Sequence, residues 1–113
     1  MNDKCICTEV LLFVEKHGLP TLRELEELGA EISLKWMAFG RRLGVRDEEL
    51  HEIDKGYDQQ SEKGYRLLRY WKQKEGCAAT YHALCTALKD KLVQRQDLAE
   101  KFCYIKGNYS LHI

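Results

Sequence analysis

Apolar residues recur at helical spacing along most of this chain, and no other feature of the sequence constrains the fold as strongly. The clearest stretch has the i, i+3, i+4, i+7, i+11 stripe of an amphipathic helix, formed by Tyr81, Leu84, Cys85, Leu88 and Leu92. Strict alternation of apolar and polar residues, which would indicate half-buried strands, is absent over any useful window. The sequence therefore predicts an all-α protein.

Start and stop signals divide this pattern into six short helices after Pro20. Thr21 and Glu24 form a capping box, in which each residue satisfies a backbone N–H of the other. Further helix starts are expected at Ser33, Asp47, Ser61, Thr80 and Asp97, and helix ends at Gly44, Gly56 and Gly76. Because the connections are only a few residues long, neighbouring helices must pack closely as an antiparallel six-helix bundle.

The core of this bundle is expected to contain two tryptophans, Trp36 and Trp71. The other residues expected to point inward are Leu22, Leu25, Leu28, Ile32, Phe39, Leu43, Leu50, Ile53, Tyr65, Leu67, Leu68, Tyr81, Leu84, Cys85, Leu88, Leu92, Leu98, Phe102 and Ile105.

The first 20 residues are expected to carry an extra N-terminal helix. Ile6, Val10 and Val14 stand at i, i+4 and i+8 within residues 5–17, and Gly18 and Pro20 follow as stop signals. Residues 21–106 would then form the bundle, and residues 107–113 a frayed tail.

Composition limits the class of protein. A length of 113 residues suits one domain. Eighteen basic and eighteen acidic residues give no formal net charge, which argues against bulk phosphate binding. The odd number of cysteines, five, favours a reducing compartment, so we expect a cytoplasmic protein. The apolar run from Val10 to Val14 is too short to span a bilayer.

Several motifs, in order and at matching separations, resemble the death domain over residues 21–105. The stretch from Trp36 to Gly44 is similar to the second-helix pattern W-x-x-L-A-x-x-L-G of that family. The fourth-helix pattern and the start of the fifth match at Leu67, Leu68, Trp71, Gly76, Ala79, Thr80, Leu84, Ala87 and Leu88, and D-L-A-E at 97–100 also fits. Phe39 and Gly40 replace the usual Leu-Ala. An interior glycine costs about 1 kcal/mol relative to alanine, and we expect Phe39 to fill the space beside it.

The resemblance implies a death-fold bundle that acts as a protein–protein interaction module. Such domains generally are not enzymes, need no cofactor, and assemble homotypically with other death-domain proteins in apoptotic and innate-immune signalling. The implied role is that of an adaptor or receptor-tail domain in the cytoplasm, without membrane insertion. The resemblance also implies that the chain can associate with copies of itself in a helical or stacked oligomer, because one face of a death domain often meets a different face of the next.

The expected interaction residues are charged and polar side chains outside the core. A basic group on the fourth helix consists of Lys63, Arg66, Arg69 and Lys72, and an acidic group on the third of Glu48, Glu49 and Glu52. A second basic cluster, Arg41, Arg42 and Arg46, and the loop residues Tyr57 and Asp58 complete the set. The alternative interpretation is that these are ordinary solvated faces, with pairs such as Glu62–Arg66 and cations at a helix C-terminus.

Other chemistry is less well supported. Cys77, His82, Cys85 and Cys103 carry zinc-ligand atoms, but their spacing is poor and no C-x-x-C pair is present. A nucleophilic cysteine has no base and orienting partner with a known signature. We therefore expect no catalytic residue and no metal. The competing class is a nucleic-acid-binding helical domain, with Arg66 and Arg69 facing phosphates and binding that weakens steeply with salt.

Overall fold

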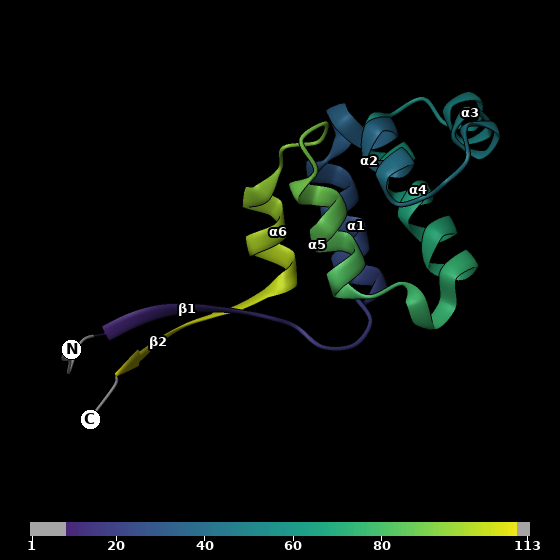
Figure 1. Ribbon diagram of the computed structural model, residues 1–113. Helices are drawn as coiled ribbons and strands as arrows, with labels where there is room; N and C mark the ends of the chain where they lie inside the picture. The colour runs from purple at the N-terminus through teal and green to yellow at the C-terminus, as the bar shows by residue number, and fades with distance from the viewer. Residues whose placement is uncertain (1–8, 111–113) are drawn as a thin grey trace.

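The computed structural model describes residues 9–110, and six α-helices account for most of them (Figure 1). The helices are α1 (Leu22–Glu31), α2 (Trp36–Arg42), α3 (Asp47–Gly56), α4 (Gln60–Glu75), α5 (Tyr81–Lys89) and α6 (Gln96–Cys103). Two short 3-10 helices, η1 (Ser33–Lys35) and η2 (Gly76–Ala78), join α1 to α2 and α4 to α5. The predicted six-helix bundle is confirmed.

Most of the predicted helix boundaries follow from local chemistry. The Thr21 hydroxyl accepts a hydrogen bond from the Glu24 amide at 3.1 Å, and the Thr21 amide donates to the Glu24 carboxylate at 2.9 Å. The Thr80 hydroxyl caps α5 by accepting a hydrogen bond from the Ala83 amide, without a reciprocal bond. The predicted caps at Ser33 and Ser61 are wrong. Ser33 is the first residue of η1, α2 begins at Trp36, and α4 begins at Gln60, in each case without a side-chain cap. At the other end of α4, Gly76 has φ of +57°, a conformation that glycine adopts without steric cost.

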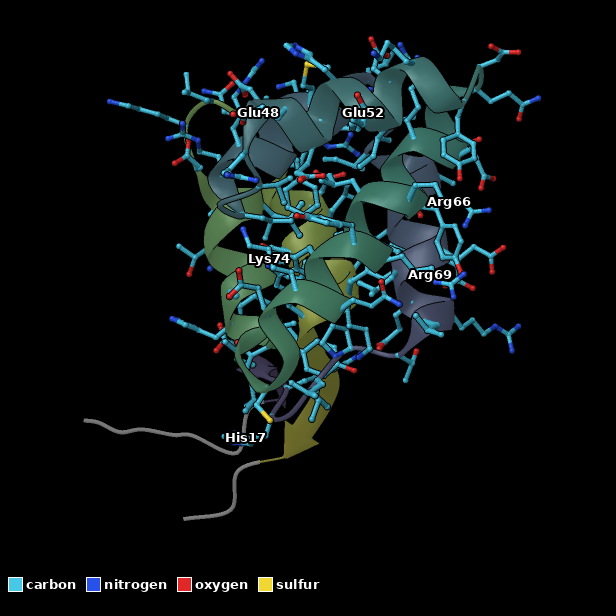
Figure 2. The ribbon with its side chains drawn as sticks, turned by 90° about the vertical axis from the view of Figure 1, so that its right-hand side faces the viewer. His17, Glu48, Glu52, Arg66, Arg69 and Lys74 are labelled. Atoms are coloured by element: carbon cyan, nitrogen blue, oxygen red, sulfur yellow. The ribbon has the colours of Figure 1, made fainter. Side chains whose placement is uncertain are left out.

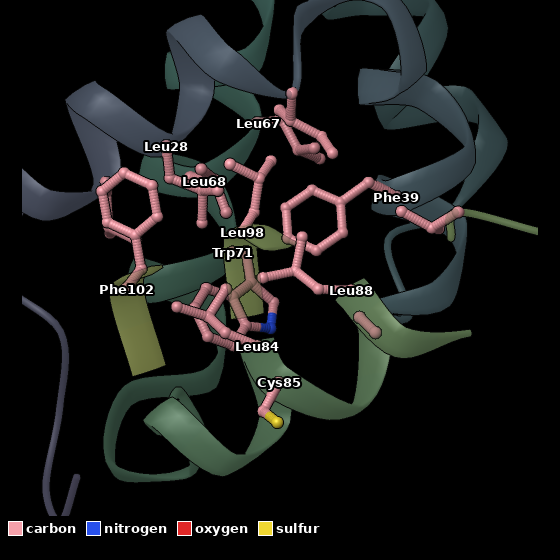
Figure 3. Packing of buried hydrophobic residues seen from close by; sticks show 14 of the residues in the cluster. Leu28, Phe39, Leu67, Leu68, Trp71, Leu84, Cys85, Leu88, Leu98 and Phe102 are labelled. Atoms are coloured by element: carbon pink, nitrogen blue, oxygen red, sulfur yellow. The ribbon is translucent and has the colours of Figure 1, made fainter. Parts of the chain in front are cut away.

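The core is a single cluster in which the helices contribute residues from their inner faces (Figure 3). Both tryptophans are buried, as predicted, and Trp71 lies among leucines of α4, α5 and α6. Full burial of such a side chain contributes roughly 1.5–3 kcal/mol through the hydrophobic effect. Because these residues are buried in the core, the side chains available to contact other molecules are those on the exterior of the helices.

Three expected core residues, Leu22, Leu92 and Ile105, are exposed. Leu92 follows the end of α5 at Lys89, so it leaves the helical stripe and is 60% exposed, while neighbouring Val93 is buried. Leu22 lies in the first turn of α1, where one side still faces solvent. Ile105 lies beyond α6, in a strand. Each error places a residue at a helix end, where spacing alone does not fix the boundary.

Helices α1 and α4 make the most extensive helix–helix contact of the bundle, and they meet at two glycines. A Cβ atom added to Gly64 would lie 2.4 Å from the carbonyl oxygen of Gly29, and one added to Gly29 would lie 2.6 Å from the Tyr65 amide nitrogen. The two backbones therefore touch directly. In α2 the side chains of Leu50 and Leu67 lie beside Gly40. That Phe39 fills part of this space stays a prediction.

The N-terminal helix predicted over residues 5–17 is wrong for its described part. Residues Glu9–Glu15 form strand β1, which pairs antiparallel with β2 (Tyr104–Ser110) in a two-stranded ribbon. The spacing i, i+4, i+8 is also even, so it fits one face of a strand as well as it fits a helix. The run Val10 to Val14 is rich in β-branched and aromatic residues, which favour strands. The predicted frayed tail is likewise corrected over 107–110, and residues 1–8 and 111–113 lie outside the described part.

The ribbon is attached to the bundle through α5. Glu15 and Tyr104 are cross-strand partners at its base. A carboxylate oxygen of Glu15 lies 2.9 Å from Nδ1 of His82, and the Tyr104 hydroxyl accepts a hydrogen bond from Nζ of Lys89 at 2.6 Å. The ribbon leaves the bundle beside α5 and α6, while α3 lies at the opposite end (Figure 1). The module limits 21–106 remain a prediction.

Candidate protein-interaction surface

The outer face of α4 carries an open hollow with a volume of about 290 Å³. It is lined by Arg66, Arg69, Tyr70 and Gln73, and we call it the α4 hollow. These positions stand at i, i+3, i+4 and i+7, so one face of the helix presents all four side chains. Figure 2 shows both arginines projecting from α4. Two guanidinium groups beside a phenol and an amide make a surface suited to an anionic group.

Arg66 is held in place from three sides. Its Nε donates a hydrogen bond to Glu62 at 2.8 Å, one turn earlier in α4. Its guanidinium lies over the rings of Tyr57 and Tyr65, with centroid distances of 4.9 and 5.7 Å. Each such cation–π contact is worth about 0.5–1 kcal/mol at an exposed position. The predicted loop residue Tyr57 is therefore brought against the predicted helix residue Arg66.

Arg69 differs from Arg66 in that its side chain is exposed and has no ion pair or hydrogen bond within the described residues. Since nothing in that part of the chain neutralises it, its charge is available to another molecule.

The other two basic residues predicted on α4 are used within the bundle. Nζ of Lys63 lies 2.6 Å from a carboxylate oxygen of Asp54 on α3, and the lysine side chain is only 14% exposed. Lys72 donates to the backbone oxygen of Pro20 at 2.6 Å and so ties α4 to the turn before α1. The structure therefore separates two structural lysines from two outward arginines.

Helix α3 presents the predicted acidic residues on the exterior, and we call Glu48, Glu49 and Glu52 the acidic α3 face. Glu49 pairs with Arg46 at 3.6 Å, and Glu52 with Lys55 at 3.4 Å. Glu48 is exposed and has no ion pair within the part of the chain that the structure describes. Glu48 and Glu52 project from α3, apart from the α4 hollow (Figure 2).

The second predicted basic cluster, at the end of α2 and just beyond it, is partly neutralised. Arg41 lies 2.9 Å from Asp47, and Arg42 lies 4.0 Å from Asp90. Arg46 is shared with the acidic α3 face through Glu49. Exposed ion pairs of this kind contribute about 0–1 kcal/mol to stability. The arginines can therefore leave these carboxylates and pair with those of another molecule. Asp58, in the connection from α3 to α4, is exposed.

The prediction from sequence missed two residues of the α4 hollow, Tyr70 and Gln73. A signal was available, because both stand on the helical face that Arg66 and Arg69 define. The contact between Tyr57 and Arg66 left no such signal, because the turn between α3 and α4 has to place the ring.

A family model described as the death domain matches residues 21–105 of the chain, which covers all six helices. The chain belongs to the death-domain family. It is also 30% identical over 91 residues to the human receptor-interacting serine/threonine-protein kinase 1, a match that covers 78% of this chain and 13% of that protein. The chain thus corresponds to a small part of that relative, its death domain and not its kinase part. No solved structure matches significantly.

Membership of the death-domain family makes this chain an interaction module whose partners are other death-domain proteins, and such modules generally are not enzymes. Within the described residues, no helix is long and apolar enough to cross a membrane.

The cysteines of this death domain lie in different environments. Cys77 is exposed on η2, whereas Cys85 and Cys103 are buried. Burial, together with the nearby Cys85 thiol, raises the pKa of Cys103 to about 12, so this thiol stays protonated at neutral pH. His82, the fourth residue considered as a zinc ligand, contacts Glu15. Among residues 9–110, no group of three or more His, Cys, Asp or Glu side chains could hold a metal ion.

Proposed function

We propose that this death domain assembles homotypically, with other death-domain proteins and with copies of itself, through the α4 hollow on one molecule and the acidic α3 face on the next. The observation that carries the proposal is the separation of charge on the surface. Arg69 is exposed at the hollow and Glu48 is exposed on α3, and neither has an ion pair within the described residues.

Such a contact is heterologous, because two different surfaces meet. Every molecule that is bound through its α4 hollow still offers its acidic α3 face, so the contact propagates into a stacked or helical oligomer unless a partner ends it. Complementary charge speeds the encounter and fixes the register more than it adds affinity. Tyr57 borders the α4 hollow through Arg66, and Arg46 borders the acidic α3 face through Glu49. Arg41, Arg42 and Asp58 belong to the proposal as further contacts at the rim.

The setting that fits this activity is apoptotic or innate-immune signalling in the cytoplasm, where a death domain serves as an adaptor or as the tail of a receptor. The family supports the setting in general terms, and the similarity to a receptor-interacting kinase is consistent with it.

A pull-down against a panel of death-domain proteins tests the proposal, with light scattering on the same preparation. We expect at least one partner to be retained, and the average mass to rise with protein concentration. Raising the salt concentration should weaken both. A chain that stays monomeric at all concentrations and retains no death-domain partner would contradict the proposal.

A further inference from the structure

We propose that the outer edge of β1 pairs antiparallel with β1 of a second copy of this chain, so that two ribbons join into one four-stranded sheet. Three observations carry the inference: the ribbon stands outside the bundle, β1 has an open backbone edge, and the sequence of β1 is complementary to itself. The contact lies on a different part of the molecule from the α4 hollow and does not depend on the proposed function.

The ribbon extends away from the helices, and within residues 9–110 it has no third strand. Figure 1 shows it leaving the bundle beside α5 and α6, and the sheet of described strands consists of β1 and β2. Even near its base, the cross-strand partners Val14 and Ile105 are each 51% exposed. An isolated two-stranded ribbon is only marginally stable in water, and three or more strands are needed for independent stability. Pairing with a second ribbon would supply them.

The backbone hydrogen bonds show which residues of β1 face its outer edge. The Lys16 amide donates to the Cys103 carbonyl oxygen at 2.8 Å, and these two residues continue the register of the ribbon. Hydrogen-bonded and non-hydrogen-bonded pairs alternate along an antiparallel ladder, so every second residue of β1 counted from Lys16 bonds to β2. The residues between them direct their backbone N–H and C=O groups to the outer edge, and these are Glu9, Leu11, Phe13 and Glu15. An edge of this kind binds another strand through main-chain hydrogen bonds.

Of the two outer edges of the ribbon, that of β1 is the one suited to pairing. The sequence of β1 is apolar from Val10 to Val14, and an exposed apolar edge strand is a template for another strand. Lys106 and Asn108 occupy the positions of β2 that face its own outer edge. Lysine protects edge strands from pairing, and asparagine is disfavoured in strands.

The sequence of β1 is nearly symmetrical about Leu12, which favours a second copy of β1 as the occupant. With a two-fold axis at Leu12, each apolar residue lies opposite another apolar residue. The pairs are Leu12 with Leu12, Val10 with Val14, and Leu11 with Phe13. Only the end pair, Glu9 opposite Glu15 of the second copy, is like-charged, and Glu15 already contacts His82 of its own bundle. Because the two β1 strands run in opposite directions, the two bundles lie at opposite ends of the sheet and leave room for the pairing.

Proline substitutions at positions that face outward test which edge pairs. Leu11→Pro removes an N–H group from the outer edge of β1 without removing a hydrogen bond to β2, and proline is tolerated at such edge positions. Lys106→Pro makes the same change on the outer edge of β2 and is the matched control. In the background Arg69→Glu, which disables the α4 hollow, analytical ultracentrifugation should show a dimer. Leu11→Pro should weaken this dimer about tenfold to thirtyfold, the effect of losing two main-chain hydrogen bonds, and Lys106→Pro should leave it unchanged.

Cross-linking tests the register of the two strands. Leu12→Cys places the new thiol opposite its own counterpart in a non-hydrogen-bonded pair, where the Cα atoms lie about 4.5 Å apart. This separation is within the range of a disulfide. Oxidised glutathione, which takes up the two electrons, should therefore link two copies through position 12. Leu11→Cys is the control, because its counterpart lies opposite Phe13. Mass spectrometry of the linked peptides separates this bond from any bond through the native cysteines.

Three results would overturn the inference. These are an Arg69→Glu protein that stays monomeric at every soluble concentration, equal dimerisation of Leu11→Pro and Lys106→Pro, and a link through position 12 no more frequent than one through position 11. Circular dichroism on each variant checks that the helices remain. None of these results bears on the proposed function, which is measured by the retention of death-domain partners and its loss in Arg69→Glu.

Discussion

The backbone contact between α1 and α4 gives the sharpest prediction about stability. We expect Gly64→Ala to destabilise the protein strongly, because the new methyl group would lie 2.4 Å from the carbonyl oxygen of Gly29. No flexible side chain can move aside, so the two helices must separate. Overpacking a well-packed contact costs about 1–3 kcal/mol, and a clash with backbone belongs at the upper end, about 3 kcal/mol. Replacing glycine by alanine inside a helix returns about 1 kcal/mol.

The expected net loss is therefore about 2 kcal/mol, equivalent to a fall in Tm of about 8 °C or more for a domain of this size. Urea denaturation followed by circular dichroism measures it as a lower midpoint with an unchanged slope. Gly56→Ala is the matched control, because Gly56 ends α3 and a Cβ there meets no atom within 4 Å. This control should be as stable as the original protein or slightly more so. If Gly64→Ala were equally stable, α1 and α4 would not touch through their glycines.

Further predictions concern titration, thiol reactivity and an internal ion pair. Burial alone would raise the pKa of Glu24, but hydrogen bonds from Lys16, Tyr81 and Thr21 lower it below the ordinary value of 4.5. The ionised carboxylate therefore stabilises the fold fully above pH 4.5. This stabilisation is lost as the pH falls through the lowered pKa. Burial and the bond to Glu24 raise the pKa of Tyr81 from 10.0 to about 12, so its contribution is complete below pH 10 and is lost as the pH rises towards 12. We therefore expect the unfolding free energy of Tyr81→Phe to fall less at acid and at alkaline pH than that of the unmodified protein. Equal falls in the two proteins would contradict the hydrogen bond between Tyr81 and Glu24. With a thiol reagent at neutral pH, Cys77→Ser should remove one fast-reacting group and Cys103→Ser none, since only the first is exposed. Lys63→Met should lower stability by about 1 kcal/mol in urea titration, because it breaks the part-buried pair with α3; no change would mean that the pair is only a solvated contact.

The features predictable from sequence were those set by local rules. The capping box at Thr21, the cap at Thr80, the glycine stops and the helical stripes depend on residues within a turn or two of one another. These local patterns predicted the six helices and the burial of both tryptophans. The ribbon could not be predicted in this way, because β1 gains its backbone partners from β2 at the other end of the described chain. The even spacing of the apolar residues in β1 is compatible with a helix or with a strand. The pairing with β2 is what makes this segment a strand.

The same distinction applies to the surface. That Arg66 and Arg69 face outward follows from their position on α4, opposite the buried leucines. The internal use of Lys63 and Lys72 does not follow, because their partners, Asp54 and the Pro20 carbonyl, are brought close only by the packing of α3 and of the turn before α1. The position of Tyr57 over Arg66 likewise depends on a turn geometry that the sequence leaves open.

Binding of death-domain partners through the α4 hollow can be tested with one comparison of dissociation constants. The measurement is the affinity of a death-domain partner, obtained by calorimetry or interferometry, for the unmodified chain, for Arg69→Glu and for Lys74→Glu. Lys74 lies on another flank of the same helix (Figure 2), and among the described residues its one hydrogen bond is a long contact of 3.4 Å to the Gly44 carbonyl oxygen. Reversing its charge is therefore a matched change away from the hollow. We predict that Arg69→Glu weakens binding by about two orders of magnitude, the range for losing a desolvated interfacial charge, while Lys74→Glu stays within a few-fold of the original. Equal affinities for Arg69→Glu and the unmodified chain, with helicity intact, would mean that partners do not bind at the α4 hollow.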